Sequence, residues 1–402
     1  MLDKKTQYEL AFAALLHDIG KFKQRAFGGK ETEISAEVKS MEGQFLPVTM
    51  DSRYSYRHAL WTYSFFLQDF FQIIRQLRLD LKLDWETIAR EAASHLKPGE
   101  KSSFSYILAK ADRISAAADC IKGEDNGSKA YLSTPLRPIF SNIDPSTDHE
   151  IIKSNWAYKM THTNDYEPYA TFPQEDGNSV CCNYKELWDG FTSALAKIKG
   201  QISCQELLRK IKDIMYCYCW CIPLATNDYA NDISLYDHSI TTMTFAISLG
   251  CSTDENRPFR LLSGDISGIQ SYIFQSKGES FKGASKTFRG RSFLISLLAP
   301  VYQIGLCDSV GIIPFCDLIE AGGRFSLLLP NTEDIEKKVR DYQLKQEKFL
   351  LEKYLGTLCI VTDLTPPLDE DDFKAQTIKG PDKGVFRKSD TQDCLNTPSF
   401  LS

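Results

Sequence analysis

Several common features are missing from this sequence of 402 residues, and each absence narrows what the protein can be. Its 12 cysteines include no Cys-x-x-Cys pair, so a structural zinc site of the usual spacing is not expected. No apolar signal segment follows Met1–Lys5, no run reaches the length of a membrane span, and no repeat or low-complexity tract occurs. These absences predict a cytoplasmic protein with reduced thiols and no contact with membranes.

Excess positive charge is also missing, because the formal net charge is −6 at pH 7. The chain as a whole is therefore not a general binder of polyanions, and any contact with nucleic acid must be a local patch. In contrast, 43% of the residues are hydrophobic and 25% are charged, which is the balance of a folded protein with a real core. The length predicts two or three domains.

The first chemical motif ends an apolar helix, rich in Ala and Leu, that is expected within residues 8–22. This helix runs into His17-Asp18, and Gly20 follows as the residue typical of a helix end. A neighbouring imidazole and carboxylate can share one divalent ion, and Mn, Fe, Ni and Mg suit nitrogen and oxygen ligands. Lys21 comes next and can hold a phosphate as a point charge. A plain polar helix end is the alternative, but the whole pattern favours a metal site.

Three further helices carry candidate ligands for the same site. His58 opens an aromatic helix, and His95 lies near the end of the helix after it. On the next helix, Asp112 and Asp119 lie two turns apart on one flank of the apolar stripe, so only one can reach an ion bound at the first motif. The pattern alone does not choose between these two aspartates.

A second pairing of carboxylate and imidazole, Asp237-His238, begins another helix within residues 232–249. A hydrogen bond that orders the helix start explains this pair, and no further histidine lies nearby in the sequence. The pair is therefore predicted to be structural.

The last third of the chain predicts a domain of mixed strands and helices, so the overall class is α+β. Strands are expected at 259–264, 311–318, 324–329 and 357–363, with helices at 267–275, 292–306 and 334–355. This order, β-α-α-β-β-α-β, is that of a ferredoxin-like fold with one added helix. A basic loop within residues 277–291 favours contact with phosphate or RNA over plain solvated surface. Its cations are Lys277, Lys282, Lys286, Arg289 and Arg291.

One carboxylate, Asp265, follows the first of these strands, and Gly322-Gly323 marks a hairpin between the middle two. A palm domain that transfers nucleotides needs carboxylates at both places, because it holds two metal ions there. The hairpin continues instead with Arg324, and Glu320 lies at its other end. This domain is therefore not expected to catalyse nucleotide transfer by itself.

Two segments near the N-terminus carry a resemblance to a known family. Ala-Leu-Leu-His-Asp-Ile-Gly-Lys-Phe at 14–22 and Ala-Asp-Arg-Ile-Ser-Ala at 111–116 resemble the permuted histidine–aspartate (HD) nuclease domain. More narrowly, they are similar to the HD domain that opens the large, polymerase-like subunit of type III-A CRISPR effector complexes. The resemblance favours Asp112 over Asp119, since the aspartate of that second motif is a ligand in the family. The family often has a His-His pair where this chain has Ser94-His95.

The resemblance implies a metal-dependent nuclease that cuts single-stranded DNA, with Mn, Ni or Mg as the cofactor. Its implied metal ligands are His17, Asp18, His58, His95 and Asp112, and its implied catalytic residues are His17, Asp18 and Lys21.

Residues 264–274 and 289–293 resemble the first palm domain of the same subunit, and 232–249 resembles the segment that leads into it. In that family a second palm carries the acidic hairpin, and cyclic oligoadenylate forms between the two palms. The resemblance thus implies a degenerate palm with ATP as its ligand, in a chain that covers only the first half of the family's length. The implied nucleotide-binding residues are Asp265, Ser267, Gly268, Gln270, Arg289 and Arg291.

These expectations divide the chain into four parts: an HD nuclease domain (1–120), a linker and helical region (121–235), a degenerate first palm (236–363) and a polar, disordered tail (364–402). The implied function is a subunit of an RNA-guided interference complex. Guide RNA, target RNA and other CRISPR subunits are its implied partners, and single-stranded DNA is its substrate. Two alternatives are an inactive scaffold that docks guide RNA and partner subunits, and a stand-alone HD phosphohydrolase acting on nucleotides.

Overall fold

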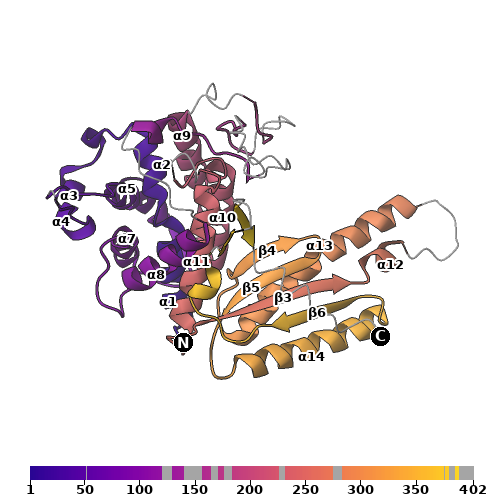
Figure 1. Ribbon diagram of the computed structural model, residues 1–402. Coiled ribbons are helices and arrows are strands. Elements are labelled where there is room, and N and C mark those ends of the chain that lie inside the picture. The colour runs from indigo at the N-terminus through magenta and orange to yellow at the C-terminus, as the bar shows by residue number, and fades with distance from the viewer. Residues whose placement is uncertain are drawn as a thin grey trace.

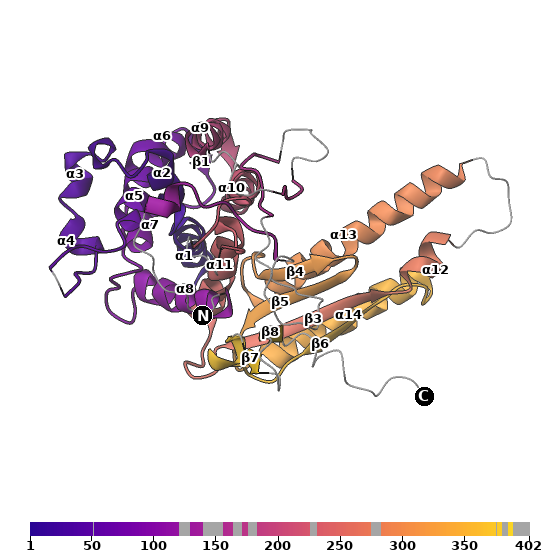
Figure 2. The same cartoon turned by 45° about the horizontal axis from the view of Figure 1, so that its top comes forward.

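A computed structural model of the chain describes residues 1–50, 52–119, 129–139, 156–163, 171–175, 183–225, 231–274, 283–374, 376–379 and 385–388. The chain forms a helical region up to residue 251 and a sheet region from residue 259 onward (Figures 1 and 2). The α+β class predicted from the sequence is confirmed.

The helical region consists of α1 (Lys4–Leu16), α2 (Ile19–Ala26), η1 (Glu31–Glu33), α3 (Ala36–Lys39), α4 (Glu42–Phe45), α5 (His58–Phe65), the π-helical turn η2 (Phe66–Phe70), α6 (Phe71–Ile74), β1 (Leu77–Leu79), α7 (Trp85–Ala93), α8 (Phe104–Asp119), η3 (Lys129–Leu132), α9 (Tyr184–Leu195), β2 (Gly200–Ile202), α10 (Cys204–Cys219) and α11 (Leu235–Cys251). The sheet region consists of β3 (Phe259–Ser267), α12 (Ile269–Phe274), α13 (Ala284–Val310), β4 (Asp317–Ala321), β5 (Arg324–Pro330), α14 (Ile335–Tyr354), β6 (Cys359–Leu364), η5 (Asp371–Phe373), β7 (Gln376–Lys379) and β8 (Val385–Lys388).

Helix α1 lies at the centre of the helical region and is buried on every side from Gln7 to Leu16. Its apolar sequence leaves no polar face, so the helix has to pack against other helices on every side. The helices that it contacts are α7, α8, α10 and α11. The helix was expected to stop at His17-Asp18, and this is confirmed, because α1 ends at Leu16; a second helix, α2, begins at Ile19.

Gly20 was expected to end the first helix, and this prediction is wrong, because Gly20 lies inside α2. A Cβ atom at this position would lie 2.1 Å from the carbonyl oxygen of His58 and 2.4 Å from the backbone nitrogen of Thr62. Only glycine therefore allows α2 to approach α5 this closely.

Helices α9 and α10, which were expected within a linker, pack into the same core as α1. The rings of Trp188 and Phe191 in α9 contact Phe22 of α2 and Phe65 of α5. Much of the expected loop region between α8 and α9 lies outside the described residues.

The main sheet has four antiparallel strands in the order β4-β5-β3-β6, which is the ferredoxin-like order. Helices α13 and α14 cover one face, where Tyr302 of α13 contacts both Phe325 of β5 and Tyr342 of α14. Side chains alternate along a strand, so Asp265 and Ser267 of β3 point to the opposite, open face and are exposed.

Three boundaries in this region differ from the sequence-based expectation. β3 continues to Ser267, so Asp265 lies within the strand, and β4 begins only at Asp317. The described part of the expected basic loop, residues 284–291, forms the first turns of α13. Lys277 and Lys282 lie outside the described residues.

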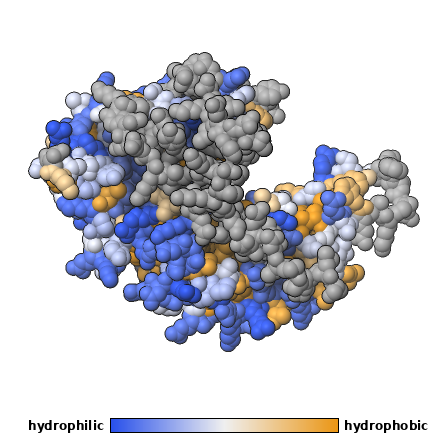
Figure 3. All heavy atoms as spheres, viewed as in Figure 1, coloured by the Kyte–Doolittle hydropathy of each residue, from blue (hydrophilic) through white to orange (hydrophobic). Residues whose placement is uncertain are grey.

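Helix α13 has 27 residues and is long and apolar enough to cross a membrane, contrary to the expectation that no segment is. One such helix is weak evidence, because core helices of soluble proteins have the same length and composition, and α13 packs on the sheet. Its Phe293, Leu297 and Val301 are exposed at four-residue spacing, and Figure 3 shows hydrophobic surface along this helix.

The segment after β6 was expected to be a polar, disordered tail, but its first part is ordered. Phe373 of η5 packs its ring against Phe245 of α11 and Phe259 of β3. Glu370 also pairs with Lys110 of α8 at 2.6 Å. β7 and β8 follow as an antiparallel hairpin, and residues 389–402 lie outside the described part of the chain.

Helix α11 lies between the two regions (Figures 1 and 2) and contacts α1 and α8 on one side and β4 and β5 on the other. Its Ser248 hydroxyl donates to the carbonyl oxygen of Leu328 in β5 at 3.0 Å. A single helix therefore runs from the interior of the helical region to the sheet.

Candidate metal centre

The break between α1 and α2 positions His17 and Asp18. Nδ1 of His17 lies 2.7 Å from the carbonyl oxygen of Ala14, which leaves Nε2 to face away from α1. Thr62 of α5 holds the break from the other side. Its hydroxyl donates to the carbonyl oxygen of His17 at 2.7 Å and accepts from the N–H of Gly20 at 3.1 Å.

His58 and His95 reach the same place from α5 and from the end of α7. His58 is the first residue of α5. His95 follows α7, and its Nδ1 lies 2.8 Å from the carbonyl oxygen of Ala92, as the Nδ1 of His17 does from its own helix. A ring fixed in this way presents Nε2 as the free ligand atom.

The structure contradicts the prediction that Asp237-His238 only orders a helix start. The N-cap residue of α11 is Ser234, whose hydroxyl accepts from the N–H of Asp237 at 3.0 Å. His238 turns inward instead, with Nε2 2.9 Å from Oδ1 of Asp112 and Nδ1 3.1 Å from the hydroxyl of Ser115. The sequence signal for placing His238 in the cluster was that this residue, one of 6 histidines in the chain, lies on a helix of mostly apolar residues.

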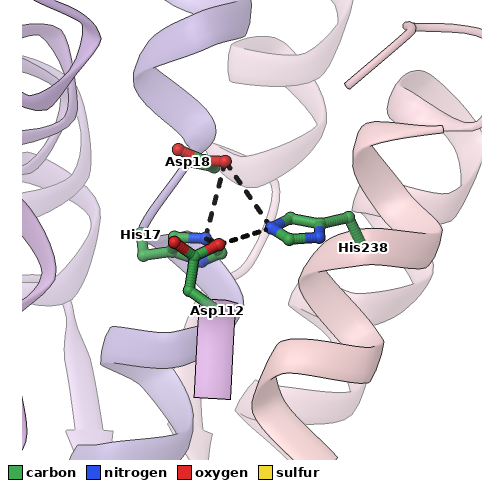
Figure 4. A group of neighbouring side chains, drawn as sticks. All are labelled: His17, Asp18, Asp112 and His238. Carbon is green, nitrogen blue, oxygen red and sulfur yellow. Dashed lines mark hydrogen bonds and ion pairs between the residues drawn. The ribbon is translucent and has the colours of Figure 1, made fainter. Parts of the chain in front are cut away.

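Four of these side chains, His17, Asp18, Asp112 and His238, form one compact group (Figure 4). Nε2 of His17 lies 3.5 Å from Oδ2 of Asp18 and 3.6 Å from Oδ1 of Asp112. Each residue offers one nitrogen or oxygen atom, and these atoms all lie within 4.8 Å of one another. Such a set can surround a single divalent ion.

Asp18 also belongs to a second group, with His58 and His95. Its Oδ1 lies 3.2 Å from Nε2 of His58 and 3.7 Å from Nε2 of His95. Its Oδ2 faces His17 and His238. The two oxygens of one carboxylate thus face two ligand groups, which is the arrangement of a carboxylate that bridges two ions.

The polar atoms of this cluster are buried and not fully satisfied by the protein. His17 is 0% exposed and Asp18 is 1% exposed. Nε2 of His17 and Oδ1 of Asp18 have no hydrogen-bond partner. Buried polar atoms without partners are costly, so the residues present fit a metal ion that would complete them.

Burial sets the charge state of the imidazoles. It lowers the pKa of His95 to about 4, with the neighbouring His17 adding to the effect. Burial also lowers the pKa of His58, against the opposing effect of Asp18. Both rings are therefore neutral near pH 7 and able to bind metal.

The two carboxylates stay ionised for a different reason. Burial alone would raise the pKa of Asp18, but Lys21 and His17 outweigh it and hold this pKa well below its usual value. Burial would likewise raise the pKa of Asp112, but the nearby imidazoles of His17 and His238 outweigh it and bring this pKa well below its usual value. Both side chains are therefore anionic ligands near neutral pH.

Lys21 lies at the edge of the cluster. Its Nζ is 2.6 Å from Oδ2 of Asp18, and its side chain is 23% exposed. The lysine thus pairs with a ligand carboxylate, while remaining open to a phosphate that arrives from solvent. Asp119, the rival of Asp112, has a side chain outside the described part of the structure.

The residues expected to bind nucleotide lie on and around β3. Asp265 pairs with Arg324 of the hairpin, with Arg324 Nε donating to Oδ1 at 3.2 Å. Arg291 donates to the carbonyl oxygen of Ile273 and lies over the ring of Tyr272.

Among the other expected nucleotide-binding residues, Gly268 has a structural reason to be glycine. Its φ is +88°, and a Cβ there would lie 2.0 Å from the carbonyl oxygen of Thr357. Gln270 and Arg289 are exposed, and Arg289 donates to the carbonyl oxygen of Ser285.

Comparisons with known proteins show what the chain is similar to. The family described as Csm1 subunit domain B matches residues 258–392. A relative from Methanocaldococcus jannaschii, named CRISPR system single-strand-specific deoxyribonuclease Cas10/Csm1 (subtype III-A), is 25% identical over 381 residues, covering 83% of this chain and 43% of the relative. A relative of the same name from Streptococcus thermophilus is 23% identical over 392 residues, covering 89% and 45%.

Solved structures share the fold. The crystal structure of Csm1 in T. onnurineus superposes with a TM-score of 0.62 at 20% identity, covering 92% of this chain and 46% of that one. The Csm1-Csm4 subcomplex of the type III-A CRISPR-Csm interference complex gives a TM-score of 0.59 at 20% identity, covering 92% and 45%. The chain spans about half the length of the curated relatives that it matches.

The mixed helical and sheet fold is that of the Csm1 class of CRISPR proteins. The chain is Cas10/Csm1-like over most of its length, as its resemblance to the large subunit of type III-A complexes predicted.

Proposed function

We propose that the helical region is a nuclease that cuts single-stranded DNA with divalent metal ions, within a subunit of a type III-A CRISPR interference complex. The observation that carries this proposal is the pair of buried ligand groups that share Asp18. The relatives are named single-strand-specific deoxyribonucleases, which supports single-stranded DNA as the substrate.

The donor set indicates which metals fit. Four imidazoles and two carboxylates combine nitrogen and oxygen ligands, and imidazole suits Ni and Fe, whereas Mg prefers oxygen ligands and water. Mn, which accepts both, and Ni are therefore the favoured ions, with Mg less suited. In this proposal His17, Asp112 and His238 would hold one ion and His58 and His95 a second, with Asp18 available to both ligand groups.

Residues of the chain itself would orient the metal ligands and contact the substrate phosphate. Carbonyl oxygens of the helix ends fix the rings of His17 and His95, so their Nε2 atoms need no rearrangement on binding. Ions held there would activate water for attack on a phosphodiester and stabilise charge on the phosphate oxygens. Asp112, with a side chain 21% exposed, and Lys21 form the open side, where a phosphate can approach and Lys21 can contact it.

The sheet region is proposed to be a degenerate first palm. Relatives have been crystallised as Csm1-Csm4 cassettes with one ATP and with cA4, which supports ATP as a ligand of this domain type. A Csm4-like subunit is proposed as a partner on the same grounds. Guide RNA and target RNA are proposed as partners because the sequence resembles the large subunit of type III-A complexes. The proposal assigns no synthesis of cyclic oligoadenylate to this chain alone.

The test is cleavage of a fluorescein-labelled single-stranded oligonucleotide by the purified chain with Mn²⁺. Wild type should cleave it, Asp18→Ala should not, and Asp265→Asn in the sheet region should cleave as wild type does. A duplex of the same sequence should survive. Equal cleavage by wild type and Asp18→Ala would remove the nuclease from this site, and no cleavage by any variant would favour the scaffold alternative. Turnover of free nucleotides without cleavage of DNA would favour the phosphohydrolase.

A further inference from the structure

An exposed aromatic side chain lies beside the metal-ligand cluster on the loop between α4 and α5. The ring of Tyr56 is centred 6.2 Å from the ring of His58 and perpendicular to it. Tyr56 is 60% exposed, while His58 is 9% exposed. The tyrosine therefore stands at the surface directly next to a buried ligand of the cluster.

The backbone of Tyr56 is strained, with φ at +54°. Residues with bulky side chains rarely adopt this left-handed region. Such strain persists only where the surroundings impose it. Both neighbours of Tyr56 are held in place. Ser55 donates twice to the carbonyl oxygen of Pro47, and Arg57 pairs with Glu42 at 2.6 Å. The loop thus holds Tyr56 in an unfavourable backbone conformation, with its aromatic ring exposed.

We propose that Tyr56 is a stacking subsite for one base of the single-stranded DNA, adjacent to the nucleotide whose phosphate enters the metal cluster. This inference rests on the proposed nuclease function and names how the substrate is held. Every base presents a π-face, so an exposed aromatic ring binds single strands without reading their sequence. The bases of a duplex are already stacked on one another, so the subsite also selects against double-stranded DNA.

The surroundings of the ring suit a nucleic-acid strand. Arg53, on the same loop, is an exposed cation that can contact the backbone. Lys21, whose side chain is 23% exposed, pairs with the carboxylate of Asp18 that also lies 3.2 Å from Nε2 of His58. Arg53 and Lys21 are therefore the cations that the phosphates of a bound strand would contact. Figure 2 shows this part of the helical region, around α4 and α5, on the side away from the sheet, so the strand can reach it without displacing the sheet region.

The first pair of variants separates the effect of the ring on binding from the effect of the backbone conformation. Tyr56→Asn removes the ring but keeps a residue that tolerates positive φ, whereas Tyr56→Phe keeps the ring. Tyr54→Asn, two residues earlier in the same loop, is the matched control. Binding of a fluorescein-labelled dT oligonucleotide is measured by anisotropy in EDTA, so that the result does not depend on cleavage.

We expect Tyr56→Asn to weaken this binding about ten-fold and Tyr56→Phe to bind as wild type does. Tyr54→Asn should change affinity less than two-fold, and none of the three variants should have a lower melting temperature than wild type. With Mn²⁺, KM for cleavage should rise in Tyr56→Asn while kcat stays within about two-fold. Unchanged affinity of Tyr56→Asn, or an equal loss in Tyr54→Asn, would overturn the proposal; the first result would assign the ring to a protein partner instead.

A second measurement locates the base. A single abasic site is moved along the oligonucleotide, and affinity is measured for wild type and Tyr56→Asn. At one position the abasic site should weaken binding to wild type but leave binding to Tyr56→Asn unchanged. In that variant the base at this position has no ring to stack on, so its removal costs nothing further. Additive losses at every position would contradict stacking. If wild type cleaves no DNA but shows this coupling, the nuclease assignment fails while the subsite stands.

Discussion

Asp18 is a buried carboxylate that belongs to two groups of candidate metal ligands. It is buried with two histidine groups around it, and it pairs with Lys21 at 2.6 Å. Lys21 and His17 favour the ionised form of this carboxylate, but its Oδ1 is buried without a hydrogen-bond partner, and such an atom is costly in the metal-free protein. Ligands of metal sites commonly have this character, since the ion supplies the missing charge.

His238 provides the sharpest test of the ligand set at the residue scale. Its Nε2 lies 2.9 Å from Asp112, so His238→Ala removes a donor and should weaken Mn²⁺ binding about ten-fold or more, measured by isothermal titration. Asp237→Asn is the matched control, because Asp237 bonds to the N-cap residue Ser234 and should leave Mn²⁺ affinity unchanged. Equal affinities in the two variants would exclude His238 from the site.

Acid should destabilise the metal-free protein through His95. The pKa of this ring is about 4 in the folded chain and about 6.5 when unfolded, so between these values only the unfolded chain binds the proton. The stability that the neutral ring contributes is complete above pH 6.5 and is lost as pH falls towards 4, by about 1.4 kcal/mol per pH unit. Urea unfolding in EDTA at pH 7, 6 and 5 measures this slope. His95→Gln should flatten it, and an unchanged slope in that variant would contradict the assignment.

At the scale of elements, local sequence signals identified most of the structure. The helices carrying His17, His58, His95 and Asp112 and the order of the sheet strands followed from apolar periodicity and from Gly and Pro positions. The errors arose where tertiary contacts decide. Gly20 ends no helix, because the crossing of α2 and α5 requires it.

His238 shows the same limit for the site. It lies 220 residues beyond Asp18 in the sequence, and only the packing of α11 against α1 and α8 brings the two together. Likewise, the strain at Tyr56 leaves no mark in the sequence, because it comes from contacts of the neighbouring residues with other elements.

Gln7 of α1 joins the helical region to the sheet region. Its side chain donates to the carbonyl oxygen of Gly311 at 3.1 Å and accepts from the N–H of Ile313 at 2.9 Å, and Gln7 is 1% exposed. Gln7→Leu leaves both buried groups unsatisfied, so the free energy of unfolding should fall by about 1–3 kcal/mol.

Lys4→Ala is the matched control on the same helix, because it removes only the exposed ion pair with Asp308 and should cost about 0–1 kcal/mol. Urea unfolding gives both values, and hydrogen exchange at Ile313 should accelerate in Gln7→Leu alone. A cost for Lys4→Ala that matches the cost for Gln7→Leu would mean that the buried hydrogen bonds do not join the regions.

At the scale of the whole molecule, α11 connects the two candidate sites physically. His238 in its first turn lies in the metal-ligand cluster, and Ser248, near its other end, is hydrogen-bonded to β5. The strand β5 begins at Arg324, which pairs with Asp265 on the open face of the sheet. The open face and the cluster are therefore linked by one helix and one strand.

The open face of the sheet has too little negative charge for nucleotide transfer. Asp265 lies directly opposite Arg324 in the β3–β5 ladder, and the two are paired. Glu320 cannot help, since it lies opposite Phe325, which faces α13, and accepts from Gln303 of that helix at 2.8 Å. Asp363 of β6, opposite Ser263, shares the open face with Asp265, but Arg324 cancels one of these two charges.

The chain alone should therefore make no cyclic oligoadenylate from ATP, because a triphosphate and two divalent ions need several carboxylates together. Labelled ATP is incubated with the pure chain and Mg²⁺ or Mn²⁺, with and without target RNA, and the products are separated by chromatography. Binding of ATP is compatible with this expectation, since Arg324 can pair with a phosphate once it leaves Asp265. A cyclic product that survives Asp265→Asn would show that the hairpin has been misread. A product lost in both Asp265→Asn and Asp363→Asn would mean that these two carboxylates suffice, or that two chains associate through their sheets.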